Sequence, residues 1–91
     1  MLSIKYISRF KKDLKKYQHQ NSILVELDIV LKYLLNKQKL PDKYRDHTLI
    51  GGYLGMRECH VKPDALLVYW VDDINQKLVL ERFGSHSELF F

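Results

Sequence analysis

Residues 65–71, Ala-Leu-Leu-Val-Tyr-Trp-Val, form an uninterrupted apolar run. A run of this length is typical of a central strand that is covered on both faces of a sheet. A chain of 91 residues has material for only one modest core. The run therefore predicts a small sheet with other elements packed on it, and we expect residues 1–91 to form a single domain.

Three further segments have the patterns of strands. Residues 2–7 and 77–83 alternate apolar and polar positions, as a strand with one buried face does. Residues 53–61 follow the Gly51-Gly52 pair and also favour a strand. The polar stretch 72–76 lies between the last two strands and predicts a turn.

The segment after the first strand has the spacing of an amphipathic helix. Phe10, Leu14 and Tyr17 recur on one side, and lysines occupy the rest of the surface. Ser8 precedes these positions and is the expected N-cap, because a serine hydroxyl accepts a hydrogen bond from the first turn.

A second, longer helix follows, with Asn21 or Ser22 as its expected N-cap and Pro41 beyond its end. Its broad apolar face consists of Leu24, Leu27, Val30, Leu31, Leu34 and Leu35. The element order is thus strand, helix, helix, strand, strand, strand. This order predicts an α+β domain with a mainly antiparallel sheet and both helices packed on one face.

The charge of +4 is divided unevenly between the halves of the chain. Residues 1–45 hold 11 lysines and arginines against 4 acidic residues, whereas residues 46–91 hold 4 against 7. The basic residues closest together in sequence are Lys5, Arg9, Lys11, Lys12, Lys15 and Lys16. They suit RNA, DNA or an acidic protein partner, although a solvated helix face would have the same composition.

Two features predict the cellular compartment. A lone cysteine, Cys59, cannot form an intramolecular disulfide bond. The start of the chain has neither the apolar region of a signal peptide nor a membrane-spanning stretch. We expect a reduced, cytoplasmic protein without a membrane segment.

Three of the four histidines lie among carboxylates and arginines in the second half of the chain. The stretches are Asp46-His47, Arg57-Glu58-Cys59-His60-Val61-Lys62-Pro63-Asp64 and Arg82-Phe83-Gly84-Ser85-His86. Side chains at positions i and i+2 of a strand share a face of the sheet, so Glu58 and His60 should lie together. Cys59 should then point to the other face as a small buried residue rather than a nucleophile.

The remaining polar groups are expected to join that pair if the three last strands are adjacent. Asp64 lies in the loop after His60, Arg82 and His86 lie at the end of the last strand, and His47 precedes the first of the three. Such groups can exchange protons near neutral pH with cations beside them, which phosphodiester cleavage without a metal requires.

Zinc competes with this interpretation, because His47, His60, His86 and a carboxylate could supply ligands. The spacings of 13 and 26 residues match no compact metal motif, however, and we predict no metal and no cofactor. The sequence also contains no Walker A motif, no Gly-x-Ser-x-Gly, no His-Glu-x-x-His and no Gly-x-Gly-x-x-Gly. Nucleotide hydrolysis, serine hydrolase and zincin chemistry are therefore unsupported.

Three blocks of residues resemble a known family. They are Tyr44-Arg45-Asp46-His47-Thr48-Leu49, then residues 57–69 from Arg57 to Tyr69, then residues 82–90 from Arg82 to Phe90. They closely resemble the YafQ-type branch of the RelE superfamily, the small basic toxins of bacterial type II toxin-antitoxin systems. The expected strand-helix-helix start agrees with the layout of that family, so the resemblance implies a RelE-like fold.

The resemblance also implies an activity and partners. Family members are mRNA interferases, which are metal-independent endoribonucleases that cut messenger RNA on the ribosome and are held inactive by an acidic antitoxin. The toxin alone is expected to be monomeric. Phe90 falls on an aromatic position near the active site, and Glu58 stands where the best-studied relative carries aspartate. The residues on the family's catalytic positions are His47, His60, Asp64 and His86.

Metal-free RNA cleavage needs a base for the 2′-hydroxyl proton, a donor for the phosphorane charge and an acid for the leaving 5′-oxygen. The sequence does not decide which of the histidines is the acid and which is the base. The expected roles are His86 as the acid, His60 with Asp64 as the base, His47 and Arg82 as phosphate stabilisers, and Phe90 as a platform on which a nucleobase stacks.

RNA binding is expected from Lys11, Lys12, Lys15 and Lys16. Two other classes of function stay open. One is a superfamily toxin that binds a protein target such as DNA gyrase and cuts no RNA, and the other is a basic nucleic-acid-binding module. Neither needs a cluster of proton-transfer groups, which is the feature that separates them from a nuclease.

Overall fold

The computed structural model describes residues 1–53 and 55–90. The helices and strands in chain order are β1 (Ser3–Tyr6), α1 (Ser8–Lys15), α2 (Asn21–Leu35), β2 (His47–Thr48), β3 (Arg57–Lys62), β4 (Ala65–Asp72), β5 (Lys77–Gly84) and α3 (His86–Leu89). Two 3₁₀ turns, η1 (Asp42–Tyr44) and η2 (Gly51–Tyr53), precede β2 and β3. No helix in this part of the chain is long and apolar enough to cross a membrane.

The five strands form one mixed sheet in the order β1-β5-β4-β3-β2. β1 pairs with β5 in parallel, and the other neighbours are antiparallel. β4 is the central strand, as its apolar run predicts, and Ala65 to Tyr69 are all buried. The prediction of an α+β domain with a mainly antiparallel sheet is confirmed.

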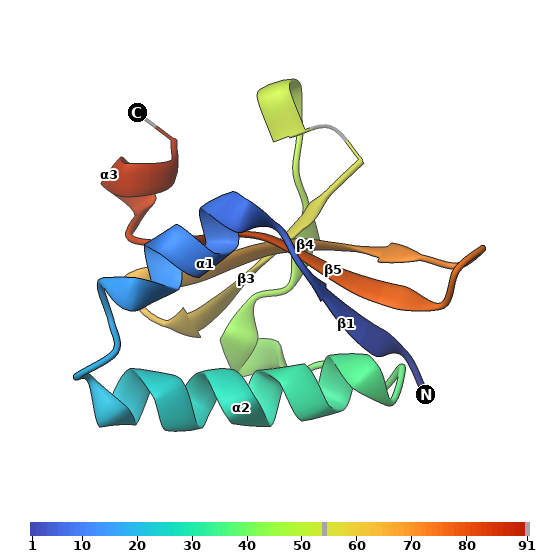
Figure 1. Cartoon of the computed structure of the whole chain (residues 1–91), viewed down its shortest axis with the longest axis horizontal. Helices are drawn as coiled ribbons and strands as arrows, with labels where there is room; N and C mark the ends of the chain where they lie inside the picture. The colour runs from blue at the N-terminus through green and yellow to red at the C-terminus, as the bar shows by residue number, and fades with distance from the viewer. Residues whose placement is uncertain (54, 91) are drawn as a thin grey trace.

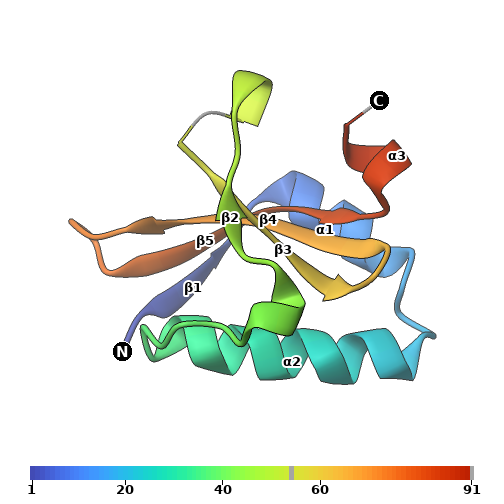
Figure 2. The same cartoon turned by 180° about the vertical axis from the view of Figure 1, so that it is seen from behind.

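The helices cover the two faces of the sheet unequally. α2 lies along one face, below the sheet in Figure 1, whereas α3 and η2 stand on the opposite side. Figure 2 shows the same arrangement from behind, with β2 in front. α1 runs antiparallel to α2 and packs on β5 through Phe10, whose ring meets Phe83 edge-on with centroids 6.3 Å apart. We call the side of α2 the covered face and the other side the open face.

The covered face holds the main core. Cys59, Leu67 and Leu80 of three adjacent strands are fully buried there together with Val30 of α2. Burial of a leucine or valine side chain contributes about 1.5–3 kcal/mol to stability. The expected role of Cys59 as a buried apolar residue is confirmed, and burial raises the pKa of its thiol. The alternation along β3 therefore places Glu58 and His60 on the open face.

The predicted N-caps of both long helices are wrong. α1 begins at Ser8, and its N-cap is Ile7, which makes no side-chain cap hydrogen bond. The backbone N–H of Ile7 still donates to the Leu80 carbonyl, so the strand passes directly into the helix without a capping residue. α2 begins at Asn21 with Gln20 as the N-cap, again without a side-chain cap.

Four short elements near the site, η1, η2, β2 and α3, were not predicted. The strand expected over residues 53–61 begins only at Arg57, because Tyr53 belongs to η2, and Leu54 lies outside the described residues. β2 has two residues, too few for a period-2 pattern to be visible. α3 has four residues, although its Ser85-x-x-Glu88 sequence is a recognisable capping box.

Candidate active site

The strand register aligns polar residues across the open face. His47 of β2 is opposite Glu58, Glu58 is opposite Val68, and Val68 is opposite Arg82. In the neighbouring row, His60 is opposite Leu66, which is opposite Gly84. His47 and Arg82, 35 positions apart in the sequence, thus lie in one row across four strands. The prediction that the last three strands are adjacent is confirmed.

Glu58 lies between two imidazoles. Its Oε1 atom is 3.3 Å from His60 Nε2 and 3.5 Å from His47 Nε2, and the Glu58 side chain is only 6% exposed. A buried carboxylate is costly unless it is paired, and here both partners can donate to it. We call His47, Glu58 and His60 the histidine-glutamate cluster. Glu58 holds both rings in place on the open face.

The ring of His47 is fixed from both sides. Its Nδ1 is 2.7 Å from the Arg45 carbonyl oxygen, which can only accept, so Nδ1 is the donor. Its Nε2 lies 3.5 Å from the Glu58 carboxylate. These two contacts fix the orientation of the His47 ring on the open face.

An anchor beneath the cluster positions His47, and sequence reasoning did not find it. Asp46 accepts hydrogen bonds from Arg57 Nε at 3.3 Å, from Arg57 Nη2 at 3.1 Å and from the Tyr69 hydroxyl at 2.5 Å. Burial and the bond to Asp46 raise the pKa of Tyr69, and the bond to Asp46 raises the pKa of Arg57. These bonds tie the residue before His47 to β3 and β4.

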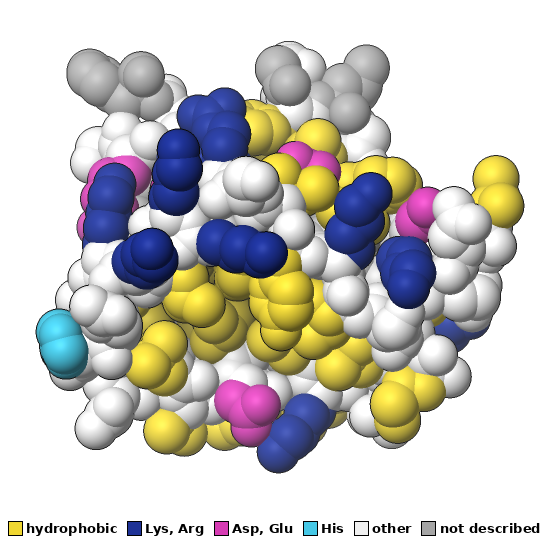
Figure 3. All heavy atoms as spheres, viewed as in Figure 1, with side chains coloured by type: hydrophobic (Ala, Val, Ile, Leu, Met, Phe, Trp, Pro, Cys, Tyr) yellow, Lys and Arg dark blue, Asp and Glu magenta, His cyan; other side chains and the backbone are white. Residues whose placement is uncertain are grey.

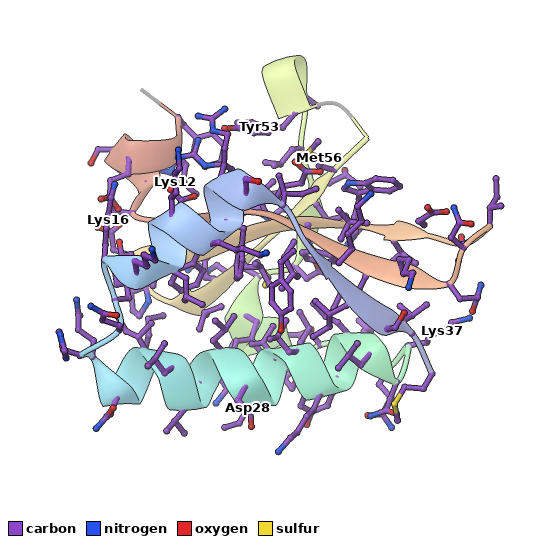
Figure 4. The ribbon with its side chains drawn as sticks, viewed as in Figure 1. Lys12, Lys16, Asp28, Lys37, Tyr53 and Met56 are labelled. Atoms are coloured by element: carbon purple, nitrogen blue, oxygen red, sulfur yellow. The ribbon has the colours of Figure 1, made fainter. Side chains whose placement is uncertain are left out.

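His86 is held through its backbone. Its N–H donates to Asp64 Oδ1 at 3.0 Å, which ties the start of α3 to the turn between β3 and β4. The imidazole is exposed and lies tilted against the Phe90 ring, with centroids 5.1 Å apart. Phe90 in turn meets Tyr53 edge-on at 5.4 Å, and the Tyr53 hydroxyl donates to the Leu89 carbonyl at 3.2 Å. Figure 4 shows Tyr53 close to α3.

Glu88 fastens α3 to α1. It completes a capping box with Ser85, and its Oε1 also accepts from the Tyr17 hydroxyl at 2.7 Å. The backbone N–H of Ser85, followed by Tyr17, lowers the pKa of Glu88 to about 2, and burial, followed by Glu88, raises the pKa of Tyr17 to about 12. Gly84 gives Glu88 room, because a Cβ atom there would stand 2.8 Å from Oε1. We call Asp64, Ser85, Glu88 and Tyr17 the α3 clamp.

Arg82 is mostly engaged in an ion pair. Its Nε and Nη2 donate to the two oxygens of Asp13 at 2.7 and 3.2 Å, and the Phe83 N–H donates to the same carboxylate at 3.0 Å. The third nitrogen, Nη1, is 3.5 Å from the Tyr53 hydroxyl. The two side chains are 13% and 9% exposed, and removing one member of such a pair costs about 3–5 kcal/mol. Only Nη1 is directed towards the aromatic residues of the site.

The lysines of the basic segment are all exposed. Lys11, Lys12, Lys15 and Lys16 lie on or directly after α1, and Figure 3 shows Lys and Arg side chains gathered over this helix. Lys16 Nζ is 3.7 Å from Glu88 Oε2, so this surface reaches the α3 clamp (Figure 4).

Comparison with known proteins identifies the family. The family model described as "Bacterial toxin of type II toxin-antitoxin system, YafQ" matches residues 2–91. The chain belongs to this family. The mRNA interferase toxin YafQ of Escherichia coli K12 is 36% identical over 88 residues, which cover 96% of this chain and 94% of the relative. The putative toxin YafQ of Haemophilus influenzae is 30% identical over 92 residues, which cover 96% of this chain and 90% of the relative.

Solved structures of bacterial toxins have the same fold. The crystal structure of a metal-bound toxin from Helicobacter pylori is 47% identical, with a TM-score of 0.90 and coverage of 99% of this chain and 100% of that chain. YafQ from E. coli BL21(DE3) is 34% identical, with a TM-score of 0.88 and complete coverage of both chains. The predicted family and the predicted RelE-like fold are confirmed.

The YafQ-family chain brings the predicted site residues together in two groups. The histidine-glutamate cluster is one group, and His86, Phe90 and Asp64 form the other around α3. Within the described part of the chain, His60 pairs with Glu58 and Asp64 bonds to the backbone of His86, so the expected pairing of His60 with Asp64 is not seen. No group of three His, Cys, Asp or Glu residues among the described ones could hold a metal ion.

Proposed function

We propose that this YafQ-family toxin cleaves messenger RNA by metal-independent attack of the 2′-hydroxyl group on the adjacent phosphate. Its E. coli relative, 36% identical, is named an mRNA interferase toxin. The observation that carries the proposal is the register that places His60 opposite Leu66 and Leu66 opposite Gly84, two residues before His86. Two strand spacings separate His60 from Gly84 by about 10 Å at the backbone, so an RNA strand that crosses Leu66 can meet His60 on one side and the start of α3 on the other.

His60 is the proposed base. Its Nε2 faces the Glu58 carboxylate, which leaves Nδ1 as the ring nitrogen that can take a proton from the 2′-hydroxyl. Glu58 acts as a positioning residue, because it is buried and holds the ring rather than meeting the substrate.

His86 is the proposed acid. Its exposed imidazole can deliver a proton to the departing 5′-oxygen, and the α3 clamp fixes its backbone while the ring faces solvent. Asp64 therefore serves by positioning His86. The ring of Phe90 lies beside His86 and offers a surface for a base next to the cut.

Charge on the phosphorane is stabilised from two directions in this scheme. His47 in its imidazolium form lies on the β2 side, and Nη1 of Arg82 lies on the β5 side. The ion pair with Asp13 keeps the guanidinium of Arg82 in one orientation, so that no entropy is lost in placing it when RNA binds.

The basic surface of α1 indicates which partners bind the toxin. The lysines border an apolar hollow lined by Tyr6, Phe10, Leu14 and Leu24, visible between α1 and α2 in Figure 3. The E. coli relative has been solved in complex with DinJ. We propose that an acidic antitoxin with apolar side chains covers this surface, and that messenger RNA on the ribosome uses its lysines when the antitoxin is absent. The free toxin acts in the cytoplasm as a monomer.

Induction of the chain in a bacterial host tests the function. The wild-type toxin should stop growth and leave fragmented messenger RNA, and a double variant, His60→Ala with His86→Ala, should do neither. Co-expression of the antitoxin should restore growth. Growth arrest by the double variant with intact messenger RNA would overturn the proposal and favour a toxin that binds a protein target such as DNA gyrase.

A further inference from the structure

A cleft beside His60 has no role in the scheme above. It has a volume of about 510 Å³ and lies between α2, η1 and the turn from β3 to β4. Its lining residues are Glu26, Lys43, Tyr44, Arg45, His60, Val61, Lys62 and Pro63. Ligand pockets commonly measure about 300–1,000 Å³, so this cleft has the size for a nucleotide. Because His60 forms part of its wall, the cleft adjoins the proposed base.

Cations surround the cleft. Lys43 and Arg45 come from η1 and its C-terminal end, where Arg45 adopts a left-handed conformation (φ 49°), and Lys62 comes from the end of β3. Among the described residues, neither Arg45 nor Lys62 has a carboxylate within ion-pair distance. These two charges can therefore pair with an RNA phosphate without breaking an existing contact.

The cleft also contains a single carboxylate, that of Glu26. Its Oε1 accepts from the Tyr44 hydroxyl at 2.5 Å and lies 3.7 Å from Lys43 Nζ. The bond from Tyr44 lowers the pKa of Glu26, and burial raises the pKa of Tyr44 to about 12, so at neutral pH Glu26 is an ionised acceptor and Tyr44 a donor. Both contacts use Oε1, and Oε2 has no protein donor among the described hydrogen bonds.

This combination selects the class of ligand. A bare phosphate would be repelled by Glu26, and a purely apolar ligand would leave Arg45 and Lys62 without a partner. A nucleotide suits both the cations and the carboxylate of the cleft, because it carries a phosphate and a base with hydrogen-bond donors. Adenine, cytosine and guanine each offer an amino group to a carboxylate, whereas uracil places its one N–H between two carbonyl oxygens that a carboxylate repels.

We infer that this cleft binds the nucleotide next to the scissile phosphate, with its phosphate on Arg45 and Lys62 and the amino group of its base on Glu26. The inference rests on the proposed function and adds a sequence preference to it. The toxin should cut poorly where that nucleotide is a uridine. Glu26 is a specificity-determining residue in this arrangement and takes no part in proton transfer.

Mapping cut sites in cellular messenger RNA tests the inference. In the wild type, uridine should be depleted at one position flanking the cut, by about tenfold, which is the usual discrimination from one good polar contact to a base. Glu26→Gln, which keeps an acceptor for Tyr44, should reduce that depletion to about twofold or less while total cleavage persists. Asp28→Asn is the matched control, because Asp28 lies on the outer side of α2 with Lys32 at 3.0 Å (Figure 4).

A second measurement addresses the phosphate contact. Lys62→Ala should weaken binding of a single-stranded oligoribonucleotide by the His86→Ala protein about three- to tenfold and should lower its salt dependence. Lys37→Ala, at a lysine that donates to Gln76 far from the cleft, should leave both unchanged (Figure 4). Thermal unfolding of each variant checks that the fold is retained.

The outcomes separate the inference from the function. An unchanged pattern of cut sites in Glu26→Gln, with wild-type cleavage, would overturn the inference and leave the proposed function standing. Loss of antitoxin binding in Glu26→Gln or Lys62→Ala, with unchanged cut sites and RNA affinity, would also overturn it and make the cleft a protein-binding surface. A wild-type toxin that makes no cuts would overturn the function and the inference together.

Discussion

At the scale of single residues, His86 and His60 are held in opposite ways. The ring of His60 lies 3.3 Å from the Glu58 carboxylate, whereas His86 is fixed by its backbone N–H and its exposed ring lies against Phe90. A ring beside a buried carboxylate is suited to receive a proton, and an exposed ring can reach a leaving group. The difference supports the assignment of His60 as the base and His86 as the acid.

His86→Ala should reduce RNA cleavage by about 10²- to 10⁴-fold, the usual contribution of a general acid. Stability should change little, because the imidazole is exposed. His19→Ala is the matched control, since His19 is an exposed histidine in the turn between α1 and α2. Cleavage assays and thermal unfolding measure both effects. Full toxicity of a stably folded His86→Ala protein would remove His86 from the mechanism.

At the scale of elements, α3 owes its place to contacts from three directions. Four residues cannot form a stable helix alone, so the capping box, Asp64 and the bond from Tyr17 to Glu88 determine whether the segment is ordered. Because Tyr17 follows α1, any partner that displaces this region also loosens the segment that carries His86. The α3 clamp thus connects the basic surface to the proposed acid.

The α3 clamp should weaken at low pH. The pKa of Glu88 in the folded protein is about 2, below its ordinary value of 4.5, so its ionised form stabilises the native state. This contribution is complete above about pH 4.5 and is lost as the pH falls towards 2. Glu88→Gln should therefore lower the melting temperature at pH 6, and the difference from the wild type should shrink towards pH 2. Parallel melting curves across this pH range would argue against the clamp.

Strand and helix patterns predict these elements only when they are long enough to show a period. The alternation over residues 77–83 and the apolar run over residues 65–71 each predict a strand that is present, and the i, i+2 rule places Glu58 beside His60 correctly. The two-residue β2 has no such period. Its pairing with β3, which brings His47 to Glu58, depends on tertiary structure.

In the folded molecule, the uneven division of charge along the sequence produces a basic surface. The basic half of the sequence supplies α1, and the acidic half supplies the open face with its carboxylates between histidines. Asp13 is the exception that the sequence could not reveal, since its partner Arg82 is 69 positions away and no local pattern predicts the pairing. The ion pair joins the two halves next to the site.

Reversal of the charge of Lys11, Lys12, Lys15 and Lys16 to glutamate should weaken binding to RNA or ribosomes and flatten its dependence on salt. Each lost contact to a single-stranded phosphate lowers the logarithmic salt slope by about 0.7. The control reverses four other lysines, Lys32, Lys37, Lys39 and Lys77, and should retain the slope. Identical salt titrations of the lysine variant and the wild type would leave α1 as a merely solvated face.

In the proposed mechanism, histidines and no metal ion carry out the cleavage. The purified toxin should be incubated with messenger RNA in the presence and absence of EDTA, and the ends of the products identified. Internal attack by the 2′-hydroxyl predicts equal cutting under both conditions, with 2′,3′-cyclic phosphate or 3′-phosphate ends. Cutting that EDTA abolishes and an added divalent metal restores would contradict the mechanism and return the histidines to the role of metal ligands.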